Sequence, residues 1–358
     1  MEEWKEYQLG DVCSRLSSGK NISASKISGS DVYPVFGGNG LRGYTDNSNF
    51  TGECAIIGRQ GAFCGNVRFF SGEAYMTEHA VVVCGNEKAN TRYLSYLLST
   101  MNLGRLSGQS AQPGLAVGTL AKQLIKLPSL PTQQKIARIL QSLDDKIELN
   151  NKINANLEQQ AQALFKNWFV DFAPFGGKMP EGWKVGKLSD LITVKYGKDH
   201  KKLYDGKYPV YGSGGIMRYV DKFLYDKESV LIPRKGTLNN VFYINEPFWS
   251  VDTMFYTEMK KENIAKYVYF FVKGKDLNSM NAGSAVPSMT TEILNAIEVV
   301  IPSDEYLEKF ENIVSPMFKQ IKHCVMENEN LASIRDTLLP KLMNGKISVT
   351  ALENSSKI

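Results

Sequence analysis

The sequence has few of the residues that build metal centres and disulfide frameworks. Its three histidines, His79, His200 and His323, lie far apart and without the spacing of metal ligands. Its five cysteines are scattered, and no Cys-x-x-Cys pair occurs. This pattern predicts a reducing, cytoplasmic setting with neither disulfides nor a zinc site.

Long apolar runs are also missing. No stretch approaches the roughly 20 residues that span a bilayer. The opening MEEWKEYQLG is acidic and amphipathic, unlike the basic start and apolar core of a signal peptide. We therefore expect no membrane association. The net charge of +5 permits nucleic-acid binding but does not by itself argue for it.

An internal repeat with a period of about 175 residues organises the chain. WKEYQLGDV from Trp4 is answered by WKVGKLSDL from Trp183. YPVFGGNGLRGYTD from Tyr33 is answered by YPVYGSGGIMRYVD from Tyr208. Shorter matches are IIGRQG with LIPRKG, Asn66-Val67 with Asn240-Val241, and SAQPGL with SAVPSM. The period is too long for a solenoid, so it predicts a duplicated domain.

The pattern within each copy predicts a mixed α/β globule of about 125 residues. Short runs rich in β-branched and aromatic residues alternate with glycine-rich turns, as strands and their connections do. A short helix is expected from Thr91 to Met101, and its counterpart in AKYVYFFV from Ala265.

A heptad seam follows each globule. From Gln133 to Phe169 the apolar residues keep 4,3 spacing around a polar step, and Thr132 is the expected N-cap. Pro316 is expected to kink the second helix or to confine its regular part to later residues. The seam positions are Ile136, Leu140, Leu143, Ile147, Asn150, Asn154, Leu157 and Leu164 in the first helix, and Phe310, Met317, Ile321, Asn328, Leu331 and Leu338 in the second.

Neither seam can face water alone. Pairing the two helices within the chain buries both stripes, and the seam asparagines would then fix the register at some cost in stability. The predicted fold is α+β, with two similar mixed α/β domains separated by two long helices that form an antiparallel coiled coil. The expected segments are 1–130 and 173–303 for the domains, and 131–172 and 304–358 for the helices. The alternative is that each helix packs on its own globule.

Catalytic and cofactor motifs are weak or missing. Gly38, Gly40 and Gly43 match GxGxxG, and Phe36 completes an FxGxG match, but the turn-like GYTDNSNF follows where a helix is needed. The second copy has Arg218 in place of the third glycine. No Pro-Pro occurs, as an amino-methyltransferase loop would need, and the sequence has no phosphate-binding loop, nucleophile elbow or HExxH. These gaps argue against a catalytic chain.

Polar and basic loop residues recur at equivalent places in the two copies. Arginine and lysine can bridge guanine O6 and N7, whereas asparagine and glutamine match adenine N6 and N7. The scaffold residues agree between the copies but the loop residues differ, which predicts that two different short DNA sequences are read. The candidates are Lys20, Asn39, Arg42, Arg59, Gln60, Arg68, Gln109 and Gln112 in the first copy, and Lys198, Lys201, Lys202, Ser213, Arg218, Arg234, Lys235, Asn239 and Asn240 in the second.

Together these motifs resemble the specificity subunit of type I restriction–modification systems over essentially the whole chain. The most specific segments are LPSLPTQQKIARILQSLDDKIELNNKIN and the terminal LLPKLMNGKI, beside the paired WK openings and the YPVFGGNG and YPVYGSGG turns. The second copy departs from the pattern, because VVIPSDEYLEKFENIV lacks the Leu-Pro start and the glutamine. This departure leaves the detailed role of the second helix open.

The resemblance implies a non-catalytic subunit that reads double-stranded DNA. Each domain would read one half of a split site, and the helices would set the gap and dock two modification subunits. Those subunits would bind S-adenosylmethionine and methylate adenine, and restriction subunits would use ATP and magnesium. The chain itself is expected to hold no cofactor and no metal. Two alternatives stay open: a self-contained methyltransferase or nuclease, and a coiled-coil scaffold that binds no DNA.

Overall fold

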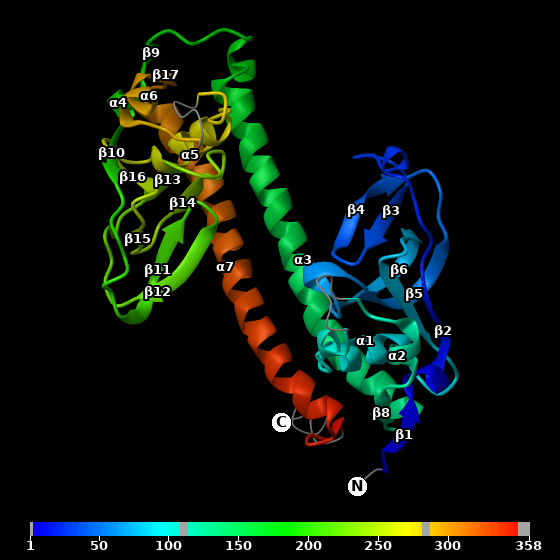
Figure 1. Ribbon diagram of the computed structural model, residues 1–358. Helices are drawn as coiled ribbons and strands as arrows, with labels where there is room; N and C mark the ends of the chain where they lie inside the picture. Colours follow the sequence, from blue (N-terminus) through cyan, green and yellow to red (C-terminus); the bar gives the residue numbers. More distant parts are fainter. Residues whose placement is uncertain (1–2, 108–113, 281–286, 350–358) are drawn as a thin grey trace. The chain divides into compact units, whose positions relative to one another are not determined.

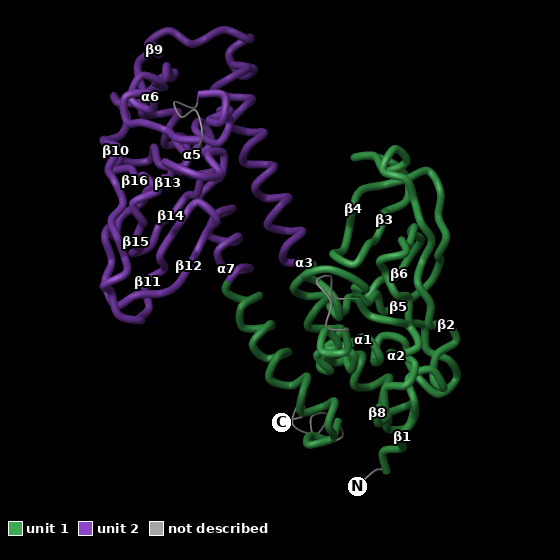
Figure 2. Tube along the Cα trace, viewed as in Figure 1, with its two compact units in different colours: residues 1–149, 326–358 green, residues 150–325 purple. Residues whose placement is uncertain are grey.

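The chain forms two compact units, each of which contains one globule and parts of two long helices. The structure is a computed structural model that describes residues 3–107, 114–280 and 287–349. One unit comprises residues 1–149 and 326–358, and the other comprises residues 150–325 (Figure 2). Each unit is described below by itself.

Strands and short helices fill the first globule (Figure 1). In chain order its elements are β1 (Lys5–Gln8), the 3-10 helix η1 (Leu9–Val12), β2 (Cys13–Ser18), η2 (Ala24–Lys26), β3 (Tyr33–Gly37), β4 (Gly40–Thr45), β5 (Phe50–Gly58), η3 (Gly61–Phe63), β6 (Val67–Met76), β7 (Ala80–Gly85), α1 (Thr91–Ser99), η4 (Leu103–Leu106), α2 (Val117–Ala121) and β8 (Leu124–Leu127). Six strands form one sheet in the order β2-β7-β5-β6-β3-β4, and β1 pairs separately with β8.

The strands of the second globule repeat this order with one break. Its elements are η5 (Ala173–Phe175), β9 (Lys184–Lys187), α4 (Leu188–Leu191), β10 (Ile192–Tyr196), β11 (Asp205–Gly212), β12 (Gly215–Val220), β13 (Ser229–Pro233), β14 (Phe242–Ile244), β15 (Trp249–Ser250), β16 (Met254–Met259), α5 (Ala265–Lys273), α6 (Thr291–Ala296) and β17 (Glu298–Ile301). The sheets run β10-β16-β13-β14 and β12-β11-β15, with β9 paired to β17. Two short strands, β14 and β15, stand where the first globule has the single strand β6, so its sheet becomes two.

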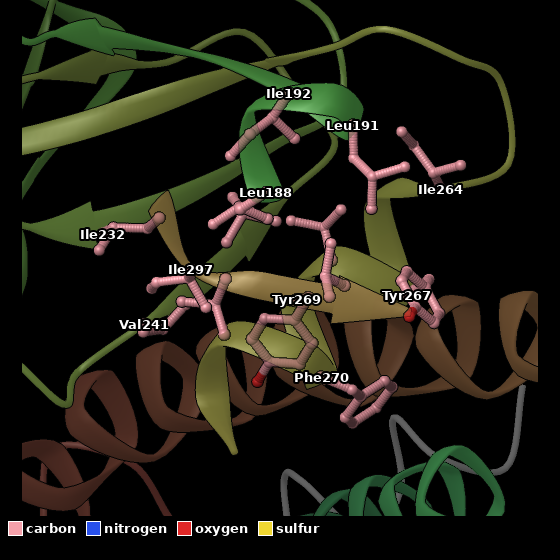
Figure 3. Packing of buried hydrophobic residues seen from close by; sticks show 14 of the residues in the cluster. Leu188, Leu191, Ile192, Ile232, Val241, Ile264, Tyr267, Tyr269, Phe270 and Ile297 are labelled. Atoms are coloured by element: carbon pink, nitrogen blue, oxygen red, sulfur yellow. The ribbon is translucent and has the colours of Figure 1, made fainter. Parts of the chain in front are cut away.

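The two short helices expected from sequence are confirmed as α1 and α5, and both anchor a globule core. Asn90 caps α1, because its Oδ1 accepts a hydrogen bond from the backbone N–H of Tyr93 at 2.9 Å. Tyr93 is itself fully buried. In the second globule Tyr267 and Phe270 of α5 pack with buried aliphatic residues of α4 and of the sheet (Figure 3). These helices therefore tie each sheet to the long helix that follows it.

The long helices are α3 (Leu130–Phe169) and α7 (Asp304–Met343), of 40 residues each. They run antiparallel. In the first unit, Asp144 of α3 pairs with Arg335 of α7. Two residues further along α3, Lys146 pairs at 3.3 Å with Glu327, which lies earlier in α7 than Arg335. In the second unit the ring of Trp168 lies 6.2 Å from that of Tyr306. As the residue numbers rise along α3, the numbers of their partners in α7 fall, so the two helices run in opposite directions. The predicted antiparallel pair is confirmed.

The helix ends also enter the globule cores, so the pairing does not exclude packing on a globule. Ile136 and Leu140 of α3 and Leu342 of α7 belong to the core of the first globule. Phe165 and Phe310 belong to the core of the second. Every expected seam position is buried or half-buried: Ile136, Leu140, Leu143, Ile147, Asn150, Asn154, Leu157, Leu164, Phe310, Met317, Ile321, Asn328, Leu331 and Leu338.

One expectation about a helix start was wrong, and so was one part of another. The helix α3 begins at Leu130, before the expected cap Thr132, and the hydroxyl of Ser129 donates to that of Thr132 at 3.2 Å. Pro131 fits there because the first turn needs no N–H donor. Pro316 does not confine α7 to later residues, since the helix runs unbroken from Asp304 to Met343. The other alternative, a kink at Pro316, stays a prediction. The Pro316 side chain is exposed, away from the packed face of α7.

The expected segment boundaries fall beside element ends. The boundary after residue 130 lies at the start of α3, and the boundary after residue 303 lies directly before α7. The compact units divide the chain differently, because each takes part of both long helices. The four-segment division therefore stays a prediction.

Candidate nucleic-acid interface

The β3–β4 hairpin tip is built from glycines and polar residues. Gly37 pairs with Gly40 and encloses Gly38 and Asn39 as a two-residue turn. Gly40 has φ +102°, a left-handed conformation that favours glycine. A Cβ on Gly40 would lie 2.5 Å from Nη1 of Arg68, so the bare backbone makes room for that guanidinium beside the tip.

A concavity of about 480 Å³ opens beside this tip. Three sequence-predicted residues, Asn39, Arg42 and Gln60, line it. Leu41 and His79 line it as well. The side chains of His79 and Glu78 form an ion pair at 3.1 Å when the imidazole is protonated. The site therefore combines amide, guanidinium, imidazole and aliphatic groups on one face of the globule.

Arg59 is fixed at the edge of this concavity by contacts from two sides. Its backbone N–H donates to the carbonyl of His79 at 2.9 Å, and its own carbonyl accepts from Leu115 at 2.9 Å. Its Nη1 donates to the carbonyl of Glu78 at 3.5 Å. Half-buried and held in this way, Arg59 is positioned before any ligand arrives.

Arg234 repeats each of these contacts in the second globule. Its N–H donates to Thr253 at 2.8 Å, and Met289 donates to its carbonyl at 2.9 Å. Its Nη1 donates to the carbonyl of Asp252 at 3.4 Å. The guanidinium also lies 5.2 Å from the ring of Tyr196, which gives it a cation–π contact.

Lys20 and Lys198 form a second matched pair. The backbone N–H of Lys20 donates to Met76 at 2.9 Å, and that of Lys198 donates to Ser250 at 2.8 Å. Both side chains are exposed. The same loop frame thus presents one lysine in each copy.

The loop after β13 meets the β11–β12 tip in the second globule. Asn240 donates from Nδ2 to the carbonyl of Ser213 at 2.7 Å. A Cβ on Gly236 would lie 2.9 Å from Oγ of Ser213, so the two loops are in close contact. Lys235 of the loop after β13 is exposed, and its backbone bridges to that of Ser288.

Some predicted residues hold loops together within the second globule. Arg218 donates to Asp205 at 2.7 Å and to the carbonyl of Leu203 at 3.1 Å. Asn239 donates to Asp276 at 3.3 Å. These side chains carry structural contacts, which the sequence pattern did not reveal. A contact between these side chains and DNA stays a prediction.

The other predicted residues lie in surface loops or outside the described part of the chain. Lys201 and Lys202 are exposed. The backbone N–H of Lys201 donates to Asp199, and this bond is the main reason that the pKa of Asp199 is lowered. Gln109 and Gln112 lie outside the described residues.

His79 and Leu41 belong to the concavity although the sequence interpretation did not propose them. From sequence, His79 is considered only as a metal ligand, and Leu41 is given no role. A signal for Leu41 was available, because Ile216 occupies the same place in the repeat. Nothing in the local sequence of His79 indicated that its loop lies beside the hairpin tip.

Within residues 3–107, 114–280 and 287–349, no group of three or more histidine, cysteine or acidic side chains could hold a metal ion. Over the same described ranges, no helix combines the length and the apolar character that crossing a membrane requires.

Comparison with known proteins places the chain in a family. The family described as "Type I restriction modification DNA specificity domain" matches residues 1–159 and 180–327, one match for each repeat copy. The chain belongs to this specificity family. Specificity subunits of type I systems recognise DNA and are not catalytic, so this chain is a recognition subunit rather than an enzyme.

Curated relatives agree with this assignment. The EcoprrI specificity subunit of Escherichia coli is 44% identical over 146 residues, which cover 40% of this chain and 36% of that relative. The MjaIX specificity subunit of Methanocaldococcus jannaschii is 28% identical over 303 residues, or 73% of this chain and 70% of that relative. The match to the first of these specificity subunits thus spans little more than a third of its length.

A solved specificity subunit has the same fold. The crystal structure of the type I restriction-modification S subunit from M. genitalium aligns with a TM-score of 0.72 and 20% identity. The alignment covers 95% of this chain and 96% of that one. Since the identity is low, the likeness supports the fold and not the residues that bind.

Proposed function

We propose that the two globules each read one half of a bipartite site in double-stranded DNA. The observation that carries this proposal is the matched pair Arg59 and Arg234. Both guanidinium groups donate to a backbone carbonyl, at 3.5 Å and 3.4 Å, in equivalent frames. The same backbone contacts hold a half-buried arginine in both globules. An arginine held in this way suits a bidentate contact to guanine.

The neighbours of these arginines differ between the copies, which supports the reading of two different sequences. Gln60 in the first globule corresponds to Lys235 in the second, and His79 corresponds to Thr253. A changed set of donors and acceptors on a constant frame changes the base pattern that fits. The two half-sites would therefore not be identical.

The paired helices would set the gap between the half-sites and dock two modification subunits. Each helix has 40 residues and would be about 60 Å long. Such a length suits a rigid spacer. In this proposal S-adenosylmethionine is bound by the modification subunits, and ATP and magnesium by restriction subunits, in a cytoplasmic complex. This chain contributes recognition and binds no cofactor itself.

The test is to express the chain with its modification subunits and to map N6-methyladenine across the host genome. A split motif with a fixed gap is expected. Arg59→Ala should relax one half of the motif, and Arg234→Ala the other half, with about tenfold or more lost in discrimination at the affected base. Equal loss in both halves for either variant would contradict the modular reading.

Matched controls come from the opposite end of each globule. Lys126 on β8 and Lys184 on β9 are exposed. Within its own globule, each of these strands lies at the far end from the hairpin tip (Figure 1). Lys126→Ala and Lys184→Ala remove one positive charge each and should leave both halves of the motif unchanged.

A further inference from the structure

Each hairpin tip presents an aliphatic side chain to solvent. In the first globule Leu41 pairs with Phe36, and in the second Ile216 pairs with Tyr211, so the two residues have the same register. Their exposed fractions are 53% and 48%. Each follows a glycine with positive φ, +102° at Gly40 and +108° at Gly215. A single exposed aliphatic residue is ordinary, but its repetition at the tip of both copies calls for a common use.

The next residue lies across the tip in both copies. A Cβ on Gly37 would lie 2.7 Å from Cδ of Arg42. A Cβ on Gly212 would lie 2.6 Å from Sδ of Met217. The absence of a side chain at this glycine lets its neighbour fold over the tip. The first tip thus carries a guanidinium where the second carries a thioether, and Met217 is 60% exposed.

The surroundings of Leu41 indicate what it would touch. It lines the same concavity as Asn39, Arg42 and Gln60. These side chains distinguish all four base pairs only in the major groove, which also admits a two-stranded ribbon. The apolar group that the base edges offer there is the C5-methyl of thymine. An aliphatic side chain among amides and a guanidinium therefore matches a thymine beside hydrogen-bonded bases.

We propose that Leu41 and Ile216 each contact the 5-methyl group of a thymine in their half-site. The following position then sets part of the difference between the halves. Arg42 favours guanine at a neighbouring base pair, whereas Met217 provides a second apolar contact and favours thymine. This inference rests on the proposed DNA-reading function and adds the base chemistry that the hairpin tips recognise.

The test uses the complex of the chain with its modification subunits and duplexes that carry the mapped site. Each thymine is replaced in turn by deoxyuridine, which removes only the 5-methyl group. The unaltered protein should lose about fourfold in affinity at one or more thymines of each half-site, the loss expected for one buried methyl group. Leu41→Ala should abolish this dependence in the first half and keep it in the second. Ile216→Ala should keep it in the first half and remove it in the second at every thymine except the one that Met217 contacts.

A residue exchange gives the matched second test. Arg42→Met should create a new dependence on a thymine methyl group in the first half-site and weaken the preference for guanine at that position. Met217→Arg should remove a methyl dependence from the second half-site. Both residues are exposed, so neither exchange should unfold the protein. Thermal unfolding of each variant checks that expectation.

Three results would overturn the inference while leaving bipartite recognition intact. The first is that no thymine-to-uracil replacement weakens binding. The second is that Leu41→Ala keeps the full methyl dependence. The third is that Leu41→Ala weakens binding to thymine and uracil duplexes equally and restores base stacking, which would make the side chain a wedge between base steps. Failure of the proposed function looks different, because then no split motif is mapped.

Discussion

Arg335 of α7 donates from Nη1 to Oδ1 of Asp144 on α3 at 2.9 Å. The other carboxylate oxygen of Asp144 accepts from the hydroxyl of Tyr96 at 2.5 Å. Tyr96 belongs to α1, so one carboxylate joins the first globule to both long helices. Burial raises the pKa of Tyr96, and the hydrogen bond to Asp144 raises it further. The phenol therefore stays a neutral donor to Asp144.

Arg335→Ala should lower the free energy of unfolding by about 1–2 kcal/mol, because it removes a charged hydrogen bond that is only partly screened by solvent. Urea denaturation measures the change. Lys309→Ala is the control, since Lys309 forms an exposed pair with Glu305 on the same helix. The control should leave the free energy of unfolding nearly unchanged, because solvent screens an exposed pair. Equal effects of the two variants would show that the contact between Arg335 and Asp144 contributes no more stability than an exposed ion pair.

Lys266 provides a deeper anchor in the second unit. Its side chain is 4% exposed, and its Nζ lies 2.6 Å from Glu311 of α7 and 3.2 Å from Glu228. Lys266→Ala leaves the half-buried Glu311 without its cation, which should cost about 3 kcal/mol. Lys261→Ala breaks an exposed pair with Asp304 and should cost less than about 1 kcal/mol. The comparison is made by thermal or urea unfolding at neutral pH.

A double variant separates burial from pairing at this anchor. Lys266→Met combined with Glu311→Leu removes both charges and keeps most of the volume. It should recover a large part of the stability lost in Lys266→Ala, because a buried pair can be replaced by apolar side chains at little cost. A double variant as unstable as Lys266→Ala would mean that packing or Glu228, and not the stranded charge of Glu311, causes the loss.

The repeat and the seam predicted most of the fold because both are encoded in patterns that span many residues. The role of a single residue in a helix is harder to predict. Thr132 has the chemistry of a cap, yet Pro131 also suits a first turn and the helix begins earlier. Pro316 has helical neighbours on both sides, and α7 continues through it. Long-range packing decides such cases, and it cannot be seen in a local pattern.

The candidate site was predictable in composition but less so in geometry. Residue type singled out Arg59 and Arg234, and the structure adds the equivalent frames around them. Residue type also singled out Arg218, whose side chain pairs with Asp205 in the same globule. His79 was missed because its approach to the hairpin tip depends on the order of strands in the sheet. Tertiary contacts of this kind have no signature in one sequence.

Glu158 makes the second unit sensitive to acid. Burial alone would raise its pKa, but hydrogen bonds from Lys273 and Tyr269 outweigh burial and hold the pKa below its usual 4.5. Because the folded-state pKa lies below the unfolded one, the ionised carboxylate stabilises the fold above about pH 4.5, and this contribution disappears as the pH falls through the folded-state pKa.

Glu158→Gln should therefore be less stable than the unaltered protein at pH 7, and the difference should shrink as the pH falls below about 4.5. Urea denaturation over a series of pH values measures it. Glu262→Gln changes an exposed carboxylate in the same unit and serves as the control. A difference for Glu158→Gln that stays constant from pH 7 to pH 3 would show that the charge of this residue is not what stabilises the unit.

Helix length should set the gap of the DNA site if the paired helices act as a spacer. One heptad adds about 10 Å, close to three base pairs, and preserves the seam. A heptad inserted after Asn154 of α3 and a matched heptad after Asn328 of α7 should lengthen the mapped gap by about three base pairs. A heptad in α3 alone leaves part of its seam without a partner, so recognition of the original site should be lost. If the doubly extended protein methylates the original motif with its gap unchanged, the helices do not measure the distance, and the gap must be set by the globules or by the modification subunits.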